Sequence, residues 1–138
     1  MSNTSKAIHV SGKRKRAVAR ATIKPGKGKI RVNAILLEHY EPALARAKLK
    51  EPLIIAGDLA DKVDISVNIM GGGQSSQAGA ARLAISRALV RFYAKDKMLE
   101  KTLLEYDRQL LVADVRRKES SKPNSHGQAR AKRQKSYR

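Results

Sequence analysis

Lysine and arginine side chains, which bind phosphate groups, are crowded at the two ends of this 138-residue sequence. Residues 1–31 contain ten basic side chains and no acidic one, and residues 116–138 contain nine basic side chains and one acid, Glu119. Residues 32–115 carry eleven of each sign, so the net charge of +18 belongs to the ends. A solubilising surface has no need for this segregation, which predicts a polyanionic partner whose binding weakens as salt rises.

The basic residues of both ends are the candidate phosphate-binding residues. Lys13-Arg14-Lys15-Arg16 could be a targeting signal or a phosphate-binding cluster, and its place at the start of a predicted strand with Arg20 and Lys24 favours the cluster. The residues predicted to bind RNA phosphate are Lys13, Arg14, Lys15, Arg16, Arg20, Lys24, Lys27, Lys29, Arg31, Arg116, Arg117, Lys118, Lys122, Arg130, Lys132 and Arg133.

A glycine-rich loop, Gly71-Gly72-Gly73 followed by Gln74-Ser75-Ser76, joins a predicted strand to a predicted helix. Free backbone N–H groups at the start of a helix favour an anion. The loop is not a Walker loop, because no Gly-Lys-Ser/Thr follows, and Ser76 stands where a dinucleotide fingerprint has its third glycine. Three interpretations stay open: a nucleotide site, an RNA phosphate site, or glycines needed only for backbone geometry.

The sequence contains no arrangement typical of a catalytic or metal site. It has no cysteine, and His9, His39 and His126 are far apart without further ligands at suitable spacing. We therefore expect no enzyme activity, no metal, no cofactor and no small-molecule substrate. With one Phe and four Tyr, binding should depend on phosphate and shape rather than on stacked bases. Since no apolar run approaches about 18 residues, we expect a soluble, cytoplasmic protein without a membrane partner.

Alternation of apolar and polar residues predicts several strands. Residues 16–24 place Ala17, Ala19, Ala21 and Ile23 on one face and basic side chains on the other, and 29–33 alternates again after the turn at residues 25–28. Residues 16–33 are therefore predicted to form a β-hairpin. Residues 8–10 are a possible short strand, and 63–69, rich in β-branched residues, is the clearest strand.

Three helical segments follow from residue spacing. Glu41-Pro42 should open a helix that Pro52 ends, before a short apolar segment that closes at Gly57. From about Ser75, apolar residues repeat at intervals of three and four: Ala78, Ala81, Ile85, Ala88 and Phe92. The small size of these residues lets the helix lie close to a sheet. A last helix is predicted from about 96 to 106.

After Val115 the apolar pattern stops. Residues 116–138 contain one large apolar side chain, Tyr137, and cannot bury enough surface to offset a backbone ordering cost of roughly 1–2 kcal/mol per residue. We therefore predict a globular RNA-binding domain over residues 1–115 and an extended basic C-terminal tail over 116–138 that is disordered when free.

Several segments spread over nearly the whole chain match one known family: Gly12 to Arg20, Lys24 to Ile30, Gly71-Gly72-Gly73 with Ser76-Gln77, Ala80, Ala84 and Ser86 to Leu89, and the ending Lys135-Ser136-Tyr137-Arg138. In these segments the sequence closely resembles the universal small-subunit ribosomal protein nine (S-nine) family, and its archaeal members in particular. The resemblance implies a compact α/β (α+β) domain with a mixed sheet covered by helices and an uncommon left-handed βαβ crossover, against the usual hand.

The resemblance also implies partners and a place in the cell. These are ribosomal RNA and neighbouring proteins in the head of the small ribosomal subunit, and the transfer RNA in the peptidyl site, whose anticodon stem-loop the tail would reach. By position, that contact falls on Lys135 and Arg138, with Tyr137 adjacent.

Two other functions compete with this one. A small-molecule kinase could use the glycine- and serine-rich loop to hold phosphate, although the chain is short and shows no evident catalytic acid. A DNA-compacting protein is compatible with the charge.

Overall fold

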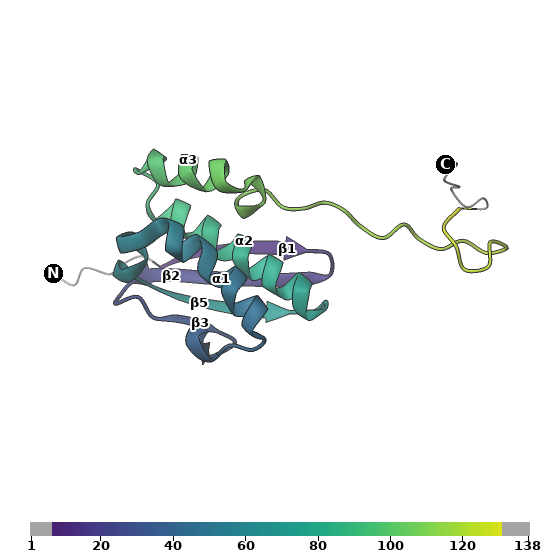
Figure 1. Cartoon of the computed structure of the whole chain (residues 1–138), viewed down its shortest axis with the longest axis horizontal. Helices are drawn as coiled ribbons and strands as arrows, with labels where there is room; N and C mark the ends of the chain where they lie inside the picture. Colours follow the sequence, from purple (N-terminus) through teal and green to yellow (C-terminus); the bar gives the residue numbers. More distant parts are fainter. Residues whose placement is uncertain (1–6, 131–138) are drawn as a thin grey trace.

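One mixed sheet and three helices make up the part of the chain that the computed structural model describes, residues 7–130. The strands are β1 (Ile8–Arg14), β2 (Ala17–Pro25), β3 (Ile30–Val32), β4 (Ile35–Leu36) and β5 (Val63–Met70). The helices are α1 (Ala43–Ala56), α2 (Gln74–Phe92) and α3 (Lys97–Tyr106), with short 3-10 turns η1 (Leu37–His39), η2 (Gly57–Lys62) and η3 (Arg108–Leu110). Figure 1 shows the helices packed together on the sheet.

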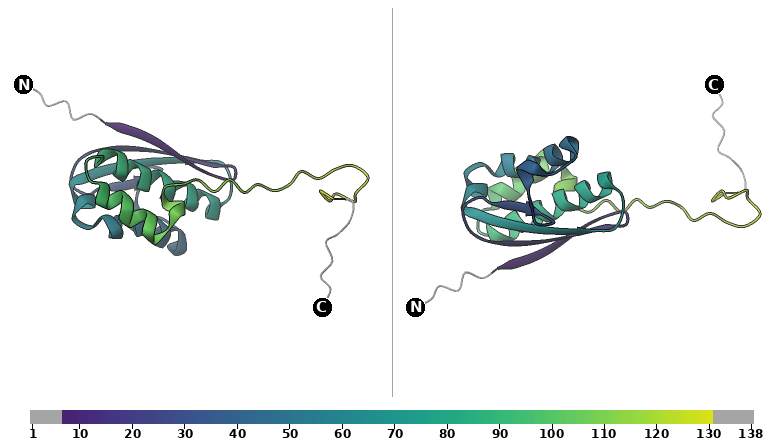
Figure 2. Two further views of the ribbon diagram at one scale, coloured as in Figure 1. Left: turned by 90° about the horizontal axis from the view of Figure 1, so that it is seen from above. Right: turned by 90° about the horizontal axis from the view of Figure 1, so that it is seen from below.

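All three helices lie on one face of the sheet and leave the other face open (Figure 2). The alternation predicted for 16–24 decides which side chains face the helices: Ala17, Ala19, Ala21 and Ile23 are buried, while Arg20 and Lys24 are exposed on the open face. The predicted fold class, a single α+β domain with a mixed sheet covered by helices, is confirmed.

The predicted hairpin over residues 16–33 is wrong. The strand order is β1-β2-β5-β3-β4, so β5 lies between β2 and β3. β2 pairs along eight positions with β5, from Val18 opposite Met70 to Pro25 opposite Val63, and pairs on its other side with β1. The true hairpin is β1–β2, because the possible strand at 8–10 extends to Arg14 and fills the other edge of β2.

The connection from β3 through α1 to β5 is a parallel crossover between neighbouring strands. In Figure 1 the helices lie in front of the sheet, β5 runs from left to right, and the chain climbs from β3 to β5. This path is left-handed, as the family resemblance implied. Most crossovers of this kind are right-handed.

Helix α1 does not end at Pro52, as predicted from sequence, but continues to Ala56. Proline inside a helix removes one hydrogen bond, at a cost of about 3 kcal/mol. Here the Pro52 ring is buried in the core, and the last turn buries Ala56 and packs Leu53 and Ile55 against it. Burial of these apolar groups offsets the lost bond. The helix ends at Gly57, whose φ is +55°, as expected from the glycine.

The predictions for β5, for α3 and for the start of α2 are confirmed within one residue. Helix α3 begins after Asp96, whose carboxylate accepts a hydrogen bond from the amide of Met98 at 3.1 Å. After η3 the chain leaves the domain as an extended segment, at the end where β1 turns into β2 (Figure 1). The predicted disorder of the free tail stays a prediction.

Helix α2 lies unusually close to β1 because small residues meet there. Ala80, Ala81, Ala84 and Ala88 of α2 are fully buried, and of these Ala81 and Ala88 belong to the apolar repeat predicted from the sequence. On β1 the facing residue is Gly12, where an added Cβ would stand 2.5 Å from the carbonyl oxygen of Ala80 and 2.8 Å from the amide nitrogen of Ala84. No side chain fits between these two backbones.

We predict that Gly12→Ala lowers the free energy of unfolding by about 1–3 kcal/mol, the usual cost of forcing extra volume into a packed core. Urea denaturation of the full chain measures this change. Gly73→Ala is the matched control, because Gly73 has open space around it and an ordinary φ of −96°, and it should stay within about 0.5 kcal/mol of the wild type. Equal stabilities of the two variants would contradict the close packing described for α2.

Candidate nucleic-acid interface

The basic cluster Lys13 to Arg16 lies at the tip of the β1–β2 hairpin and not at the start of a strand as predicted: Lys13 and Arg14 end β1, and Lys15 and Arg16 form the turn. Lys15 has a φ of +52°, so the chain reverses tightly at this residue. Lys13, Lys15 and Arg16 are exposed, whereas Arg14 is partly buried. The turn therefore presents several cationic groups at one end of the domain.

The glycine-rich loop lies directly beside this turn. Gly71 and Gly72 have φ values of +75° and +69°. A Cβ on Gly71 would lie 2.8 Å from the carbonyl oxygen of Arg16, and one on Gly72 would lie 2.9 Å from the amide nitrogen of Ala17. Of the three interpretations of the loop, backbone geometry accounts for these two glycines.

Gly73 is different, since open space surrounds it at the start of α2. No side chain caps this helix, and the amide of Gln77 makes the first helical hydrogen bond to the carbonyl of Gly73 at 2.9 Å. The amides before Gln77 have no acceptor within the helix. They add partial positive charge next to the basic turn.

The start of the tail is fastened to the same turn by Asp114, a residue that sequence reasoning missed. Its side chain is 6% exposed and forms ion pairs with Arg14 and Arg116, the latter at 2.8 Å from Arg116 Nη2 to Asp114 Oδ2. Asp114 is the last acid before the basic tail, and that position is the one signal that could have drawn attention to it. Arg14 is therefore paired with a carboxylate in the domain.

These elements enclose a groove of about 890 Å³, which we call the hairpin groove. It is lined by Arg14, Lys15, Arg16, Gly72, Gly73, Ser76, Arg116, Arg117 and Lys118. Six of these nine residues are cationic, and none is acidic. They come from the two basic ends of the sequence, which are about one hundred residues apart and meet here. Such a surface is suited to phosphate groups.

Other predicted residues lie away from the hairpin groove. Arg20, Lys24 and Arg31 are exposed on their strands, on the face of the sheet that carries no helix. Lys122 and Arg130 lie farther along the tail and pair with Glu119, at 3.9 and 3.1 Å. Lys132, Arg133, Lys135, Tyr137 and Arg138 lie outside the described residues.

Lys27 and Lys29 lie in the turn between β2 and β3, which Asp64 of β5 holds in place. The Oδ1 atom of Asp64 accepts hydrogen bonds from the amides of Lys29 and Lys27, each at 2.9 Å. These two bonds, with a smaller contribution from the Lys24 charge, hold the pKa of Asp64 below its usual value of 3.8. The carboxylate stays ionised and keeps the turn closed at neutral pH.

Two arginines of α2, Arg82 and Arg87, have roles that the sequence did not indicate. Arg82 pairs with Glu51 of α1 and with Asp107 after α3, at 2.5 and 3.0 Å. Arg87 donates from Nε to the carbonyl of Leu111 and from Nη1 to the carbonyl of Ser11, both at 3.0 Å. Together they fasten the segment that leads into the tail against α2 and β1.

The histidines are dispersed over β1, η1 and the tail. Among residues 7–130 there is no group of three or more His, Asp or Glu side chains placed to hold a metal ion.

Phe92 and Tyr93 pack edge to face, and the Tyr93 hydroxyl donates to the carbonyl of Leu59 at 2.7 Å. No helix in the described part is long and apolar enough to cross a membrane.

The structure is thus a small α+β domain with a groove of clustered cations, a surface suited to phosphate groups. Comparison with known proteins gives its family. Residues 12–138 match the family model described as ribosomal protein S9/S16. The chain is 50% identical over 133 residues to small ribosomal subunit protein uS9 of Methanothrix thermoacetophila, covering 96% of this chain and 99% of that protein. It is 48% and 47% identical over 134 residues to the proteins of that name from Methanococcus maripaludis and Methanococcus vannielii, with the same coverage.

The chain therefore belongs to the ribosomal protein S9/S16 family. It is a small-subunit ribosomal protein of the archaeal type, a part of the ribonucleoprotein that carries out translation in the cytoplasm. The resemblance found in the glycine-rich loop, the basic turn and the Lys-Ser-Tyr-Arg ending is thereby confirmed.

We predict that Asp114→Asn lowers the free energy of unfolding by about 1–3 kcal/mol, because it leaves the partly buried Arg14 without a counter-charge. It should also speed amide exchange in residues 14–17. Urea denaturation and hydrogen exchange measure the two effects. Asp58→Asn, at an exposed carboxylate in η2, serves as the control and should change neither. Identical behaviour of the two variants would show that the ion pair does not hold the tail start to the turn.

Proposed function

We propose that this protein binds ribosomal RNA in the head of the small subunit, next to other head proteins, in a structural and not a catalytic role. One observation carries the proposal: the two basic ends of the sequence meet in the hairpin groove, which no acidic residue lines. Counter-ions released from RNA as its phosphates enter this groove would drive binding. Family membership supports RNA as the polyanion.

The groove residues favour recognition of the RNA backbone over recognition of bases. Lysine and arginine supply charge-assisted hydrogen bonds to phosphate oxygens, and the first amides of α2 add further donors. None of the residues lining the groove is aromatic, so no base can stack there. The protein would therefore recognise the shape of folded RNA, with position fixed by phosphate contacts.

The remaining predicted residues extend this surface. Five further basic side chains are exposed and available to RNA. Three lie on the open face of the sheet, Arg20, Lys24 and Arg31, and two lie in the turn held by Asp64, Lys27 and Lys29. Lys13 lies at the end of β1 that leads into the hairpin groove. Along the tail, Lys122, Arg130, Lys132 and Arg133 would follow the RNA beyond the domain.

The packing role of the glycine-rich loop argues against the kinase alternative. Gly71 and Gly72 serve the close approach to residues 16 and 17, and no carboxylate lines the hairpin groove in front of the loop to hold a metal–nucleotide complex or accept a proton. The nearby carboxylate of Asp114 is paired with Arg14 and Arg116. Competition between ribosomal RNA and duplex DNA separates the proposed function from DNA compaction. Equal affinity for both would favour compaction.

We predict that Lys15→Gln/Arg16→Gln weakens binding to small-subunit ribosomal RNA roughly tenfold at physiological salt and reduces the salt dependence of log K by about 1.4–1.8, as expected for two lost phosphate contacts. Filter binding over a range of salt concentrations measures both quantities. Both side chains are exposed, so folding should be unaffected.

The matched control for this variant is Lys50→Gln/Lys101→Gln, which removes the same charge from exposed positions on α1 and α3. Its affinity should stay within about threefold of the wild type, since charges away from the contact act only through a screened field. If the two double variants lose the same affinity, binding follows net charge and the hairpin groove is not the RNA site.

We further propose that the end of the tail contacts the anticodon stem-loop of the transfer RNA in the peptidyl site. Lys135 and Arg138 would contact its phosphates, with Tyr137 beside them. The family resemblance supports this role, as does the direction of the described tail, which leads away from the domain (Figure 1). A full extension of 23 residues at about 3.3 Å each gives a reach on the order of 75 Å.

Deletion of residues 136–138 should leave folding intact and weaken transfer RNA binding to the peptidyl site a few-fold, because charge-assisted contacts to the backbone are lost. The measurement is transfer RNA affinity of small subunits reconstituted with the truncated protein. The variant Lys135→Arg/Arg138→Lys keeps both charges and should behave as the wild type. Unchanged affinity after deletion would exclude a role for the end of the tail.

A further inference from the structure

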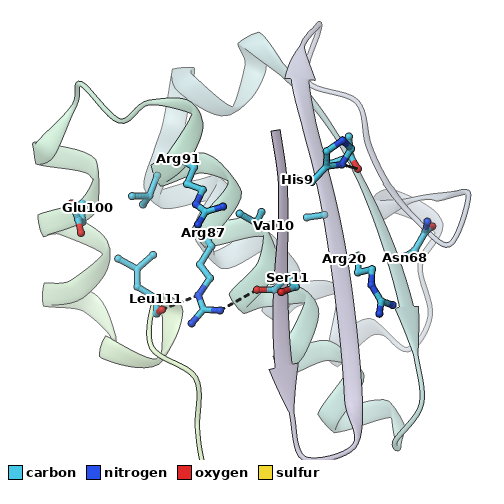
Figure 3. A pocket seen from close by; sticks show the side chains of 12 residues that line it. His9, Val10, Ser11, Arg20, Asn68, Arg87, Arg91, Glu100 and Leu111 are labelled. Carbon is cyan, nitrogen blue, oxygen red and sulfur yellow. Dashed lines mark hydrogen bonds between the residues drawn. The ribbon is translucent and has the colours of Figure 1, made fainter. Parts of the chain in front are cut away.

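A second groove, of about 810 Å³, runs along the free edge of β1 and is separate from the hairpin groove. Figure 3 shows that its side chains lie on both sides of β1: Arg87, Arg91 and Glu100 toward the helices, and Arg20 and Asn68 toward the open face of the sheet. We call it the edge groove. Its lining residues come from the basic N-terminal segment and from the electrically neutral middle of the sequence.

A free strand edge commonly pairs with a strand from another protein, but the edge of β1 is obstructed. The guanidinium of Arg87 lies across it, with Nη1 bonded to the carbonyl of Ser11 and Nε bonded to the carbonyl of Leu111 (Figure 3). The outward-facing carbonyl of Ser11 is therefore occupied by a side chain from α2. An added strand would have to displace both hydrogen bonds.

The charges of the edge groove favour an anion. Arg20 and Arg91 are exposed and have no ion pair or side-chain hydrogen bond to any residue in the described range. Arg87 adds a third guanidinium, whose acceptors are neutral carbonyls, so its charge is not cancelled. One carboxylate, Glu100 on α3, lines the groove against these three cations.

We infer that the edge groove is a second phosphate-binding site, in which an RNA strand crosses the edge of β1 between Arg20 and Arg91. Val10, Val90 and Leu111 supply apolar surface for the sugars. This inference rests on the proposed function, because it takes the polyanion to be RNA. Ser11 and Lys15 are four residues apart along the chain, about 14 Å in an extended strand. The two grooves would thus hold RNA at both ends of β1.

Two single substitutions that should change RNA affinity in opposite directions test this assignment. Arg91→Gln should weaken binding to the small-subunit ribosomal RNA transcript roughly three- to tenfold and reduce the salt dependence of log K by about 0.7–0.9. Glu100→Gln removes the one carboxylate of the groove and should strengthen binding about two- to threefold. Lys101→Gln, at an exposed neighbour that does not line the groove, is the control and should have little effect. If Arg91→Gln behaves as Lys101→Gln does, the inference is wrong.

A tethered cleavage reagent tests the position of the RNA directly. The chain has no cysteine, so Ser11→Cys, Lys15→Cys and Lys101→Cys each create one attachment site for an iron chelate that cleaves nearby RNA backbone. We expect cleavage of the transcript from positions 11 and 15, at different nucleotides, and none from position 101.

The possible outcomes distinguish this inference from the proposed function. Cleavage from position 15 alone would overturn the edge groove and leave the hairpin groove as the RNA site. Cleavage from neither position would contradict the proposed function itself. Crosslinking of the Ser11→Cys variant to another head protein in reconstituted subunits, without cleavage of RNA, would identify the edge of β1 as a protein contact and would also overturn the inference.

Discussion

The close approach of α2 to the β1–β2 hairpin is the constraint on which the rest of the structure depends. It requires small residues on both sides, Gly12 on β1 and alanines such as Ala80 and Ala84 on α2. Because α2 lies so near the sheet, its first turn meets the hairpin turn and its Arg87 reaches over β1 to the carbonyl of Ser11. A bulkier interface would move the helix outward by the width of a side chain and separate the groups that form both grooves.

Local patterns predicted the elements well, but they could not predict which strands pair. The alternation in 63–69 and the three- and four-residue spacing after Ser75 are properties of single segments, and both gave nearly correct bounds. The turn at residues 25–28 carries ordinary hairpin signals, so 16–33 was interpreted as a hairpin. The actual partner of β2 is β5, about forty residues later. β5 pairs with β2 at eight positions, more than the three-residue β3 could offer. A turn signal contains no information about such a distant competitor.

The same limit applies to the candidate site. Charge segregation correctly indicated two basic ends, yet it could not show that they meet at one groove, nor that Arg14 is already paired with a carboxylate one hundred residues away. Pro52 is comparable, because the rule that proline ends a helix describes an isolated helix and not one whose next turn packs into a core. In each case the deciding interaction is tertiary, and no spacing within a short window reports it.

The neutral middle of the sequence has a physical reason. Several of its acids hold the domain together: Glu51 and Asp107 pair with Arg82, Asp114 pairs with Arg14, and Asp64 accepts two backbone hydrogen bonds. Because these acids pair within the domain, none of them lines the hairpin groove, where a carboxylate would repel phosphate. Cations held by internal acids fix the shape of the domain before RNA arrives, so binding need not first order these side chains. Exposed cations such as Lys15 and Arg16 then lose no internal partner when they contact phosphate, and the attraction is not offset by a broken ion pair.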